Sequence, residues 1–398
     1  MSRRTARWVW AVAVLFGALA AADARACPFC SAQGKTLLGE VTQANLILFG
    51  ELVNARRDPN EFNKGSTDLK IEMVVKDHPI LAGRKTITLP RYVPPDPNDA
   101  TKYLVFCEVY NGKVDPYRGV AVRADSKIAS YLKGAIAVRE KPLAEQLKYF
   151  FRFLNDPDPD IANDAYTEFG NADYKEYRPM AEELPADVVV GWLKDPNTPA
   201  SRYGLYGSML GHCGKPEHAA VLRQLLDDPQ RRFSSGMDGM LAGYVMLDPK
   251  EGWNYLRGIL ADPKREFLVR YAGLRAVRFF HDYRPDVVPE EKLVEAVTLL
   301  LEQSDIADLP IDDLRKWKRW ETADKVFALY DRESHQVPIV KRAVLRFALS
   351  CPESNKKAAE LVKRARAEDP ERVRDIEELL ELERAAAAEN RAAADGGK

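Results

Sequence analysis

The sequence predicts an exported protein of two parts, a small antiparallel β domain followed by a longer α-solenoid of paired helices. Short alternating strand patterns and turn signals dominate before about residue 140, and amphipathic helical patterns dominate after it. In the second part, Asp-Pro pairs recur at intervals of roughly 33–40 residues, the period of two-helix solenoid repeats. The start of the chain has the pattern of a secretory signal.

The signal covers residues 1–26. Three arginines lie within the first seven residues, an apolar run follows at 8–22, and Ala-Arg-Ala at 24–26 fits a small-x-small cleavage site. The apolar run is shorter than the roughly 20 residues that a spanning helix needs. We therefore expect a periplasmic or secreted chain that begins at Cys27 and has no membrane span. A lipid anchor on Cys27 is the alternative, although Arg25 fits a lipoprotein signal poorly.

Composition and charge narrow the classes of partner. The chain has 398 residues, 46% of them hydrophobic, and a formal net charge of -1. Such a balance is typical of globular domains and gives no reason to expect nucleic acid or an anionic membrane as partner.

The β domain is predicted over residues 27–138. Apolar or alternating segments of strand length lie at 44–56, 69–77, 85–89, 102–110 and 119–122. Asn111-Gly112 is the preferred residue pair of a type I′ turn, so it predicts a hairpin between two of the strands. Five short antiparallel strands indicate a small closed or partly open barrel, as in the OB-fold.

The helical part is predicted over residues 139–383. Asp-Pro pairs at 156–157, 195–196, 228–229 and 262–263 mostly close apolar segments, and because proline cannot continue a helix each pair marks a helix end. Looser helical units follow at 290–303, 322–332, 337–350 and 356–370. The charged, alanine-rich end at 384–398 is expected to be a disordered tail.

Two resemblances add to this prediction. The second part resembles HEAT-type repeats of the armadillo-type class. The resemblance rests on its period, on its Leu-rich helix ends before Asp-Pro, and on the apolar stripe along residues 266–280, "EFLVRYAGLRAVRFF". The first part is similar to the netrin-like domain of tissue inhibitors of metalloproteinases through its cysteine at the mature start, "ANLILFGELV", and "KYLVFCEVYNGK". That family begins Cys-x-Cys, whereas this chain begins Cys-x-x-Cys. The second resemblance implies an OB-fold, and an amine on Cys27 that chelates a partner's zinc.

The cysteines at 27, 30 and 107 allow several chemistries. Haem attachment is excluded because Ser31, not histidine, follows the second cysteine. A glutaredoxin-like redox pair would need Cys27 and Cys30 at a helix start, and a soft-metal site for zinc or copper would need a fourth ligand such as His78. We favour a disulfide from Cys107 to one of the other two, with a Cys27–Cys30 bond as the alternative.

Two further clusters draw attention. "GHCGKPEH" at 211–218 gathers two histidines and a cysteine, but it lies where an inter-helix turn is expected. "LRKWKRWE" at 314–321 interleaves basic and aromatic residues, and we expect one helix with its two tryptophans buried and its basic side chains in solvent. The interaction candidates there are Arg315, Lys316, Lys318 and Arg319.

The sequence holds no phosphate-binding loop, no nucleophile elbow and no zinc-protease motif. We therefore predict a non-catalytic protein outside the cytoplasm, without a cofactor, that binds a protein partner through its solenoid surface. An envelope thiol-redox or soft-metal protein that uses Cys27 and Cys30 is the alternative.

Overall fold

The computed structural model describes residues 27–30, 32–59, 64–94, 101–229 and 235–396, with side chains as far as residue 389. The predicted signal at 1–26 lies outside these residues. Within them, no helix is both long enough and apolar enough to cross a membrane.

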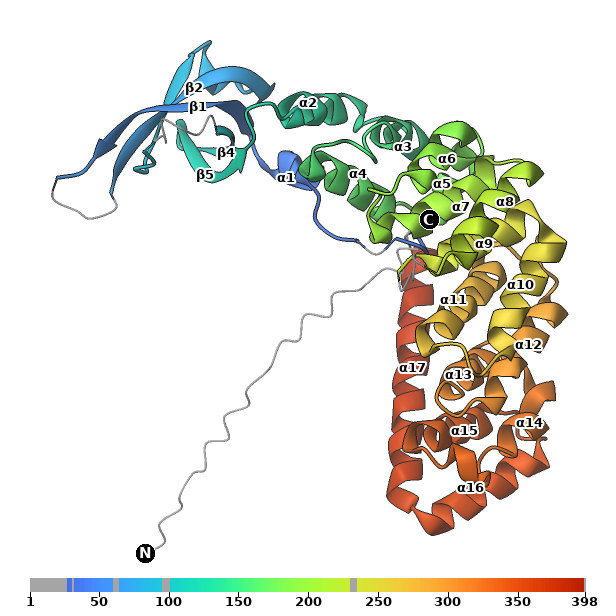
Figure 1. The fold of residues 1–398 in the computed structure, drawn as a ribbon. Helices are drawn as coiled ribbons and strands as arrows, with labels where there is room; N and C mark the ends of the chain where they lie inside the picture. Colours follow the sequence, from blue (N-terminus) through green and yellow to red (C-terminus); the bar gives the residue numbers. More distant parts are fainter. Residues whose placement is uncertain (1–26, 31, 60–63, 95–100, 230–234, 397–398) are drawn as a thin grey trace, which may run out of the picture.

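Five antiparallel strands form one sheet, as the sequence predicted (Figure 1). Their order is β3-β2-β1-β4-β5, so β3 and β5 are its edges among the described residues. Pro116 lies in β5, where an edge strand tolerates the missing backbone N–H. The strands are β1 (Leu46–Arg57), β2 (Gly65–Lys76), β3 (Thr86–Leu89), β4 (Lys102–Tyr110) and β5 (Lys113–Val122).

The turn between β4 and β5 is the hairpin that the sequence predicted. Asn111 has φ 48° and Gly112 has φ 68°. A type I′ turn needs positive φ at both central residues, and asparagine and glycine adopt that conformation at the least cost. The predicted hairpin is therefore confirmed.

The two faces of the sheet belong to different apolar clusters because successive side chains of a strand point to opposite sides. On β4, Leu104 and Phe106 join the large core that the helices share. Val105 and Cys107 join a small separate cluster on the other face, together with Leu46 and other side chains of the sheet.

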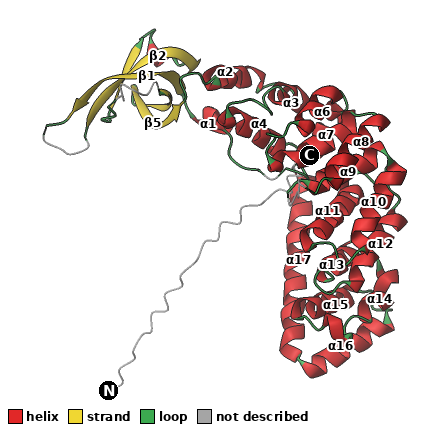
Figure 2. Ribbon diagram, in the orientation of Figure 1, coloured by secondary structure: helices red, strands yellow, loops and turns green. Residues whose placement is uncertain are grey.

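Helices make up most of the remaining chain (Figure 2). A short helix, α1 (Leu37–Gln43), precedes the sheet. The first helices after the sheet are α2 (Ile128–Val138), α3 (Leu143–Phe151), α4 (Pro159–Asn171), α5 (Tyr174–Ala181) and α6 (Ala186–Lys194). The later ones are α7 (Tyr203–Cys213), α8 (Ala219–Asp227), α9 (Met237–Leu247), α10 (Pro249–Ala261), α11 (Phe267–Tyr283), α12 (Glu290–Thr298), α13 (Asp308–Lys316), α14 (Ala323–Phe327), α15 (Pro338–Ser350), α16 (Lys356–Glu368) and α17 (Pro370–Gly396).

Three of the four Asp-Pro pairs stand at helix ends as predicted. Asp195, Asp228 and Asp262 are the C-caps of α6, α8 and α10. The fourth pair, at 156–157, differs, because α3 already ends at Phe151 and a series of turns follows.

From α7 onward the helices stack in two layers. The inner layer consists of α7, α9, α11, α13 and α15, and the outer layer of α8, α10, α12, α14 and α16. Within the inner layer α7 packs on α9, α9 on α11 and α13 on α15, and an ion pair of 2.9 Å between Arg278 and Asp313 joins α11 to α13. The chain as a whole is arched, with the sheet at one end and α16 at the other (Figure 1).

The last helix, α17, does not extend the two layers but runs back beside α15 and α16 (Figure 1). The predicted disordered tail at 384–398 is wrong for residues 384–396, which continue α17. Alanine has the highest helix propensity, and the run at 385–388 therefore favours the helix. Residues 397–398 lie outside the described residues.

Candidate functional site

The two amino-terminal cysteines bond to each other. The Sγ atoms of Cys27 and Cys30 are 2.11 Å apart, and the backbone N–H of Cys30 donates to the carbonyl of Cys27 at 3.3 Å, which closes a tight turn. The favoured disulfide from Cys107 is therefore wrong, and the alternative pairing is the one observed.

The sheet explains why Cys107 stays free. Cys107 is fully buried in the small cluster on one face of β4, whereas Cys27 belongs to the large core on the other face. A one-residue step along a strand reverses the direction of a side chain, so the sulfur of Cys107 points away from the amino-terminal segment. Burial raises the pKa of the Cys107 thiol to about 12, which makes it a poor nucleophile.

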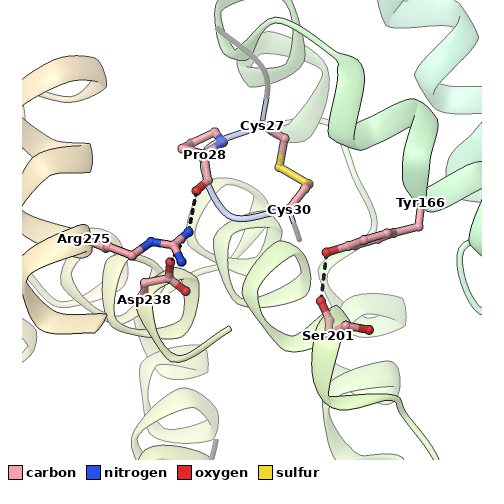
Figure 3. The surroundings of a disulfide bond; sticks show 7 residues. All are labelled: Cys27, Pro28, Cys30, Tyr166, Ser201, Asp238 and Arg275. Atoms are coloured by element: carbon pink, nitrogen blue, oxygen red, sulfur yellow. Dashed lines mark hydrogen bonds and ion pairs between the residues drawn. A yellow bond between two sulfur atoms is a disulfide. The ribbon is translucent and has the colours of Figure 1, made fainter. Parts of the chain in front are cut away.

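The disulfide turn is seated on the inner layer of helices (Figure 3). The ring of Phe29, only 3% exposed, lies 4.6 Å from the ring of Phe279 on α11. Arg275 of α11 donates to the carbonyl of Pro28 at 3.3 Å and pairs with the buried Asp238 of α9 at 2.9 Å. The turn is thus held by an aromatic contact and by a cation whose own partner is buried.

Glycines allow the turn and the helices to approach closely. A Cβ at Gly204 of α7 would lie 2.7 Å from the carbonyl oxygen of Phe29. Where α7 crosses α9, a Cβ at Gly239 would lie 2.0 Å from the carbonyl oxygen of Gly204, and one at Gly243 would lie 2.1 Å from that of Gly207. This crossing was not predicted, although glycines three or four residues apart in both α7 and α9 were its visible signal.

The chain continues from the turn along α4 before it enters α1. We call residues 27–30 and 32–36 the strap. Gly34 and Asn171 exchange two hydrogen bonds, of 3.0 Å to the amide oxygen and 2.9 Å from the amide nitrogen of Asn171. The N–H of Leu37 donates to the buried carboxylate of Asp164 at 2.6 Å. The strap therefore ties the segment that leads to the sheet onto the helical layers.

Buried acids lie beneath the end of the strap. Asp164 also accepts a hydrogen bond of 2.8 Å from Tyr131, and burial raises its pKa. One helical turn later, burial raises the pKa of Glu168 to about 7, with a further increase from the charge of Asp164, while a hydrogen bond with Thr36 lowers it. The junction beneath the strap therefore holds a carboxyl whose pKa lies near neutral pH.

The disulfide turn is not itself the start of a helix, as the glutaredoxin-like alternative would require. In thiol oxidoreductases a helix N-terminus beside the motif stabilises the thiolate. Here Cys27 to Cys30 form a turn, and the first helix begins only at Leu37. Cys27 is buried and Cys30 is partly buried against the core.

The candidate metal ligands have local roles. Among the described residues, no three His, Cys, Asp or Glu side chains are placed to hold a metal ion. His78 accepts a hydrogen bond from the N–H of Ile80 and His218 accepts one from that of Lys215. His212 is hydrogen-bonded to Tyr174 at 3.1 Å, and burial lowers its pKa to about 3.

The basic-aromatic segment at 314–321 is not one helix, so that expectation is wrong. α13 ends at Lys316, and Lys318 takes a positive φ of 58°, which turns the chain before Trp320. Trp317 then stacks on His281 at 4.1 Å, and Trp320 packs edge-on against Phe347.

The four interaction candidates fall into two kinds. Arg315 is buried and binds Asp312 and Glu383, and Arg319 is paired with Glu290. Lys316 and Lys318 are exposed, and Lys316 pairs with Asp312 at 2.8 Å. Within this segment, the arginines thus tie helices together and the lysines face solvent.

Comparison with known proteins gives a weak structural likeness. The sequence matches no protein-family model and no curated protein. Among solved structures, human deoxyhypusine hydroxylase in complex with glycerol aligns with 63% of this chain and 95% of its own chain, at 16% sequence identity and a TM-score of 0.25. At that TM-score the likeness carries no argument about fold or function.

Proposed function

We propose that this chain is a non-catalytic protein-interaction protein of the periplasm or the extracellular space. In this proposal the sheet is an open OB-like barrel and the two helical layers are a HEAT-like solenoid, whose inner layer presents the binding surface. The observation that carries the proposal is the use of the cysteine motif as a seated turn. Phe29 of the motif packs on Phe279, and Arg275 donates to the carbonyl of Pro28, so the motif helps to build the helical surface.

The Cys27–Cys30 disulfide supports the proposal that the chain is exported. Disulfides persist in oxidising compartments, and the proposed cleavage before Cys27 would leave the turn at the mature start. A sulfur engaged in a disulfide has no free valence for a thioether lipid. We therefore propose a mature chain without a lipid anchor.

Site-specific photo-crosslinking in the native envelope tests the proposal. A photoreactive residue would replace Leu268 of α11, which is 52% exposed and lies two helical turns before Arg275 on the same face. The matched control replaces the exposed Lys292 of the outer-layer helix α12. We expect a discrete protein adduct from position 268 and none from position 292. Equal labelling from both positions would refute binding by the inner layer.

One observation favours a second function. The bond between Cys27 and Cys30 is the pairing that an envelope thiol oxidoreductase would use. Thiol titration and a turnover assay with a dithiol substrate separate the two functions. We expect a bond that resists mild dithiols in the folded chain and no turnover. Rapid reduction with steady turnover would instead establish the redox function.

A further inference from the structure

The carboxy-terminal helix α17 packs against α15 of the inner layer and α16 of the outer layer, and its Glu383 reaches α13, much as a bound helix would. As far as residue 389, where the described side chains end, three apolar side chains of α17 are nearly fully buried: Val373, Ile376 and Leu380. They stand at positions i, i+3 and i+7, the spacing with which an amphipathic helix fills a groove. By contrast, α15 of the inner layer buries six side chains over a shorter length. The described attachment of α17 is therefore slight for a helix of 27 residues.

Charge supplies the rest of the attachment. Arg315 of α13 donates to both oxygens of Glu383, at 2.8 and 3.1 Å, and Arg346 of α15 donates to one of them at 2.9 Å. One carboxylate of α17 thus joins two helices of the inner layer. Hydrogen bonds between ionised groups are stronger than neutral ones, so Glu383 anchors α17 to the inner layer, while Glu377 pairs with Arg366 of α16.

The face beneath α17 is cationic once the helix is taken away. Asp312 then remains as the acidic partner of three cations, with distances of 2.9 Å to Arg315, 2.8 Å to Lys316 and 3.3 Å to Arg346. The Nε atom of Arg346 is buried and has no hydrogen-bond partner in the described part of the chain. Without Glu383, Arg315 and Arg346 would share the single carboxylate of Asp312 with Lys316, so the face favours an anionic side chain from its occupant.

We propose that the α13–α15 face is a binding groove for an acidic amphipathic helix of a partner protein, and that α17 is the chain's own occupant, which the partner displaces. This inference rests on the proposed interaction function and gives it a site and a class of partner. The partner helix presents apolar residues at i, i+3 and i+7 with a carboxylate one turn further on, as α17 does with Leu380 and Glu383. Because α17 is tethered to the groove by the chain itself, its effective concentration there is high, and the partner helix must compete with it.

A labelled peptide tests the groove in the full mature chain. The probe is a fluorescent peptide of residues 370–389, and its binding is followed by fluorescence anisotropy. Glu383→Gln in the chain weakens the resident helix, and we expect the peptide to bind that variant about tenfold more tightly than the unchanged chain. The matched control is Glu381→Gln, which changes an exposed glutamate on the same helix. We expect it to leave peptide binding unchanged.

Two companion variants locate the binding site. A peptide that carries Glu383→Gln is expected to bind about tenfold more weakly to the Glu383→Gln chain. Arg346→Gln in the Glu383→Gln chain is expected to remove the gain, because it removes the cation that the peptide's carboxylate would reach. Circular dichroism verifies that each variant keeps its helical content apart from α17.

Three results would overturn the inference. The first is equal peptide binding by the Glu383→Gln and Glu381→Gln chains. The second is a gain in peptide affinity that persists when Arg346→Gln is added. The third is a concentration-dependent dimer of the Glu383→Gln chain, which would make a second copy of the chain the occupant. The proposed function would fail separately, through absence of the adduct at position 268, since that test leaves α17 unchanged.

Discussion

Phe29 is the side chain that seats the disulfide turn. It is 3% exposed and packs on Phe279, which itself contacts Tyr174 and Tyr283. Phe29→Ala should lower the free energy of unfolding by about 3–5 kcal/mol, because a buried ring is lost and the cavity is walled by fixed helices. Urea denaturation measures the loss. Phe267→Ala, which removes a ring that is 40% exposed, should cost less than about 1 kcal/mol. Equal losses would show that the turn is not seated through Phe29.

Glu168 makes the junction beneath the strap sensitive to pH. Its folded pKa of about 7 lies above the unfolded value of 4.5, chiefly because burial penalises the charged form. The folded state therefore binds more protons between these two values, and the free energy of unfolding falls as the pH rises from about 4.5 to about 7. In Glu168→Gln that part of the decline should disappear. Melting temperatures of both chains between pH 4 and pH 8 measure it, and parallel curves would contradict the assignment.

At the scale of elements, the crossing of α7 and α9 depends on missing side chains. Gly239→Ala places a methyl group 2.0 Å from the backbone oxygen of Gly204, so the helices must separate, and we expect a loss of at least about 2 kcal/mol. The same substitution at Gly258 of α10 meets no atom within 4 Å and should stabilise the chain by about 0.5–1 kcal/mol. Thermal denaturation compares the two variants. A shift of the same sign in both would show that the close approach does not matter.

Helices, strands and turns could be predicted from the sequence where single residues restrict the backbone conformation. Strand alternation, the Asn111-Gly112 turn and three of the Asp-Pro helix ends each follow from the conformations that single residues allow, and all are observed. The break after α13 was missed because Lys318 takes a left-handed conformation that nothing in its side chain favours. The extension of α17 was missed because its charge was taken as a sign of disorder, whereas its alanines favour a helix.

At the scale of the whole molecule, the decisive contacts join residues far apart in the chain. Arg275 and Pro28 are 247 positions apart, and Gly34 and Asn171 are 137 apart. No local pattern encodes such a pairing. The favoured partner of Cys107 was wrong for the same reason, since spacing alone did not tell which face of the sheet the strap would meet. The interaction candidates follow from the charge of their side chains. Their partners, Glu383 for Arg315 and Glu290 for Arg319, lie far away in the sequence and are visible only in the folded structure.

The strap makes the sheet and the helices one cooperative unit. The large core runs without interruption from Phe49 and Phe106 in the sheet, through Phe29, to Leu380 in α17. Hydrogen exchange should therefore show that peptides from β4 and α4 open with the same free energy. The double variant Cys27→Ser, Cys30→Ser frees the turn, and the chain-entropy model puts its cost near 2 kcal/mol for so short a loop. We expect β4 to open before α4 in that variant, whereas Cys351→Ser, which removes a free thiol elsewhere, should leave the two coupled. Coupled opening in the double variant would mean that the interface between α1, α2 and the sheet holds the two parts together without the strap. Separate opening in the unchanged chain would mean that the sheet and the helices are not one cooperative unit.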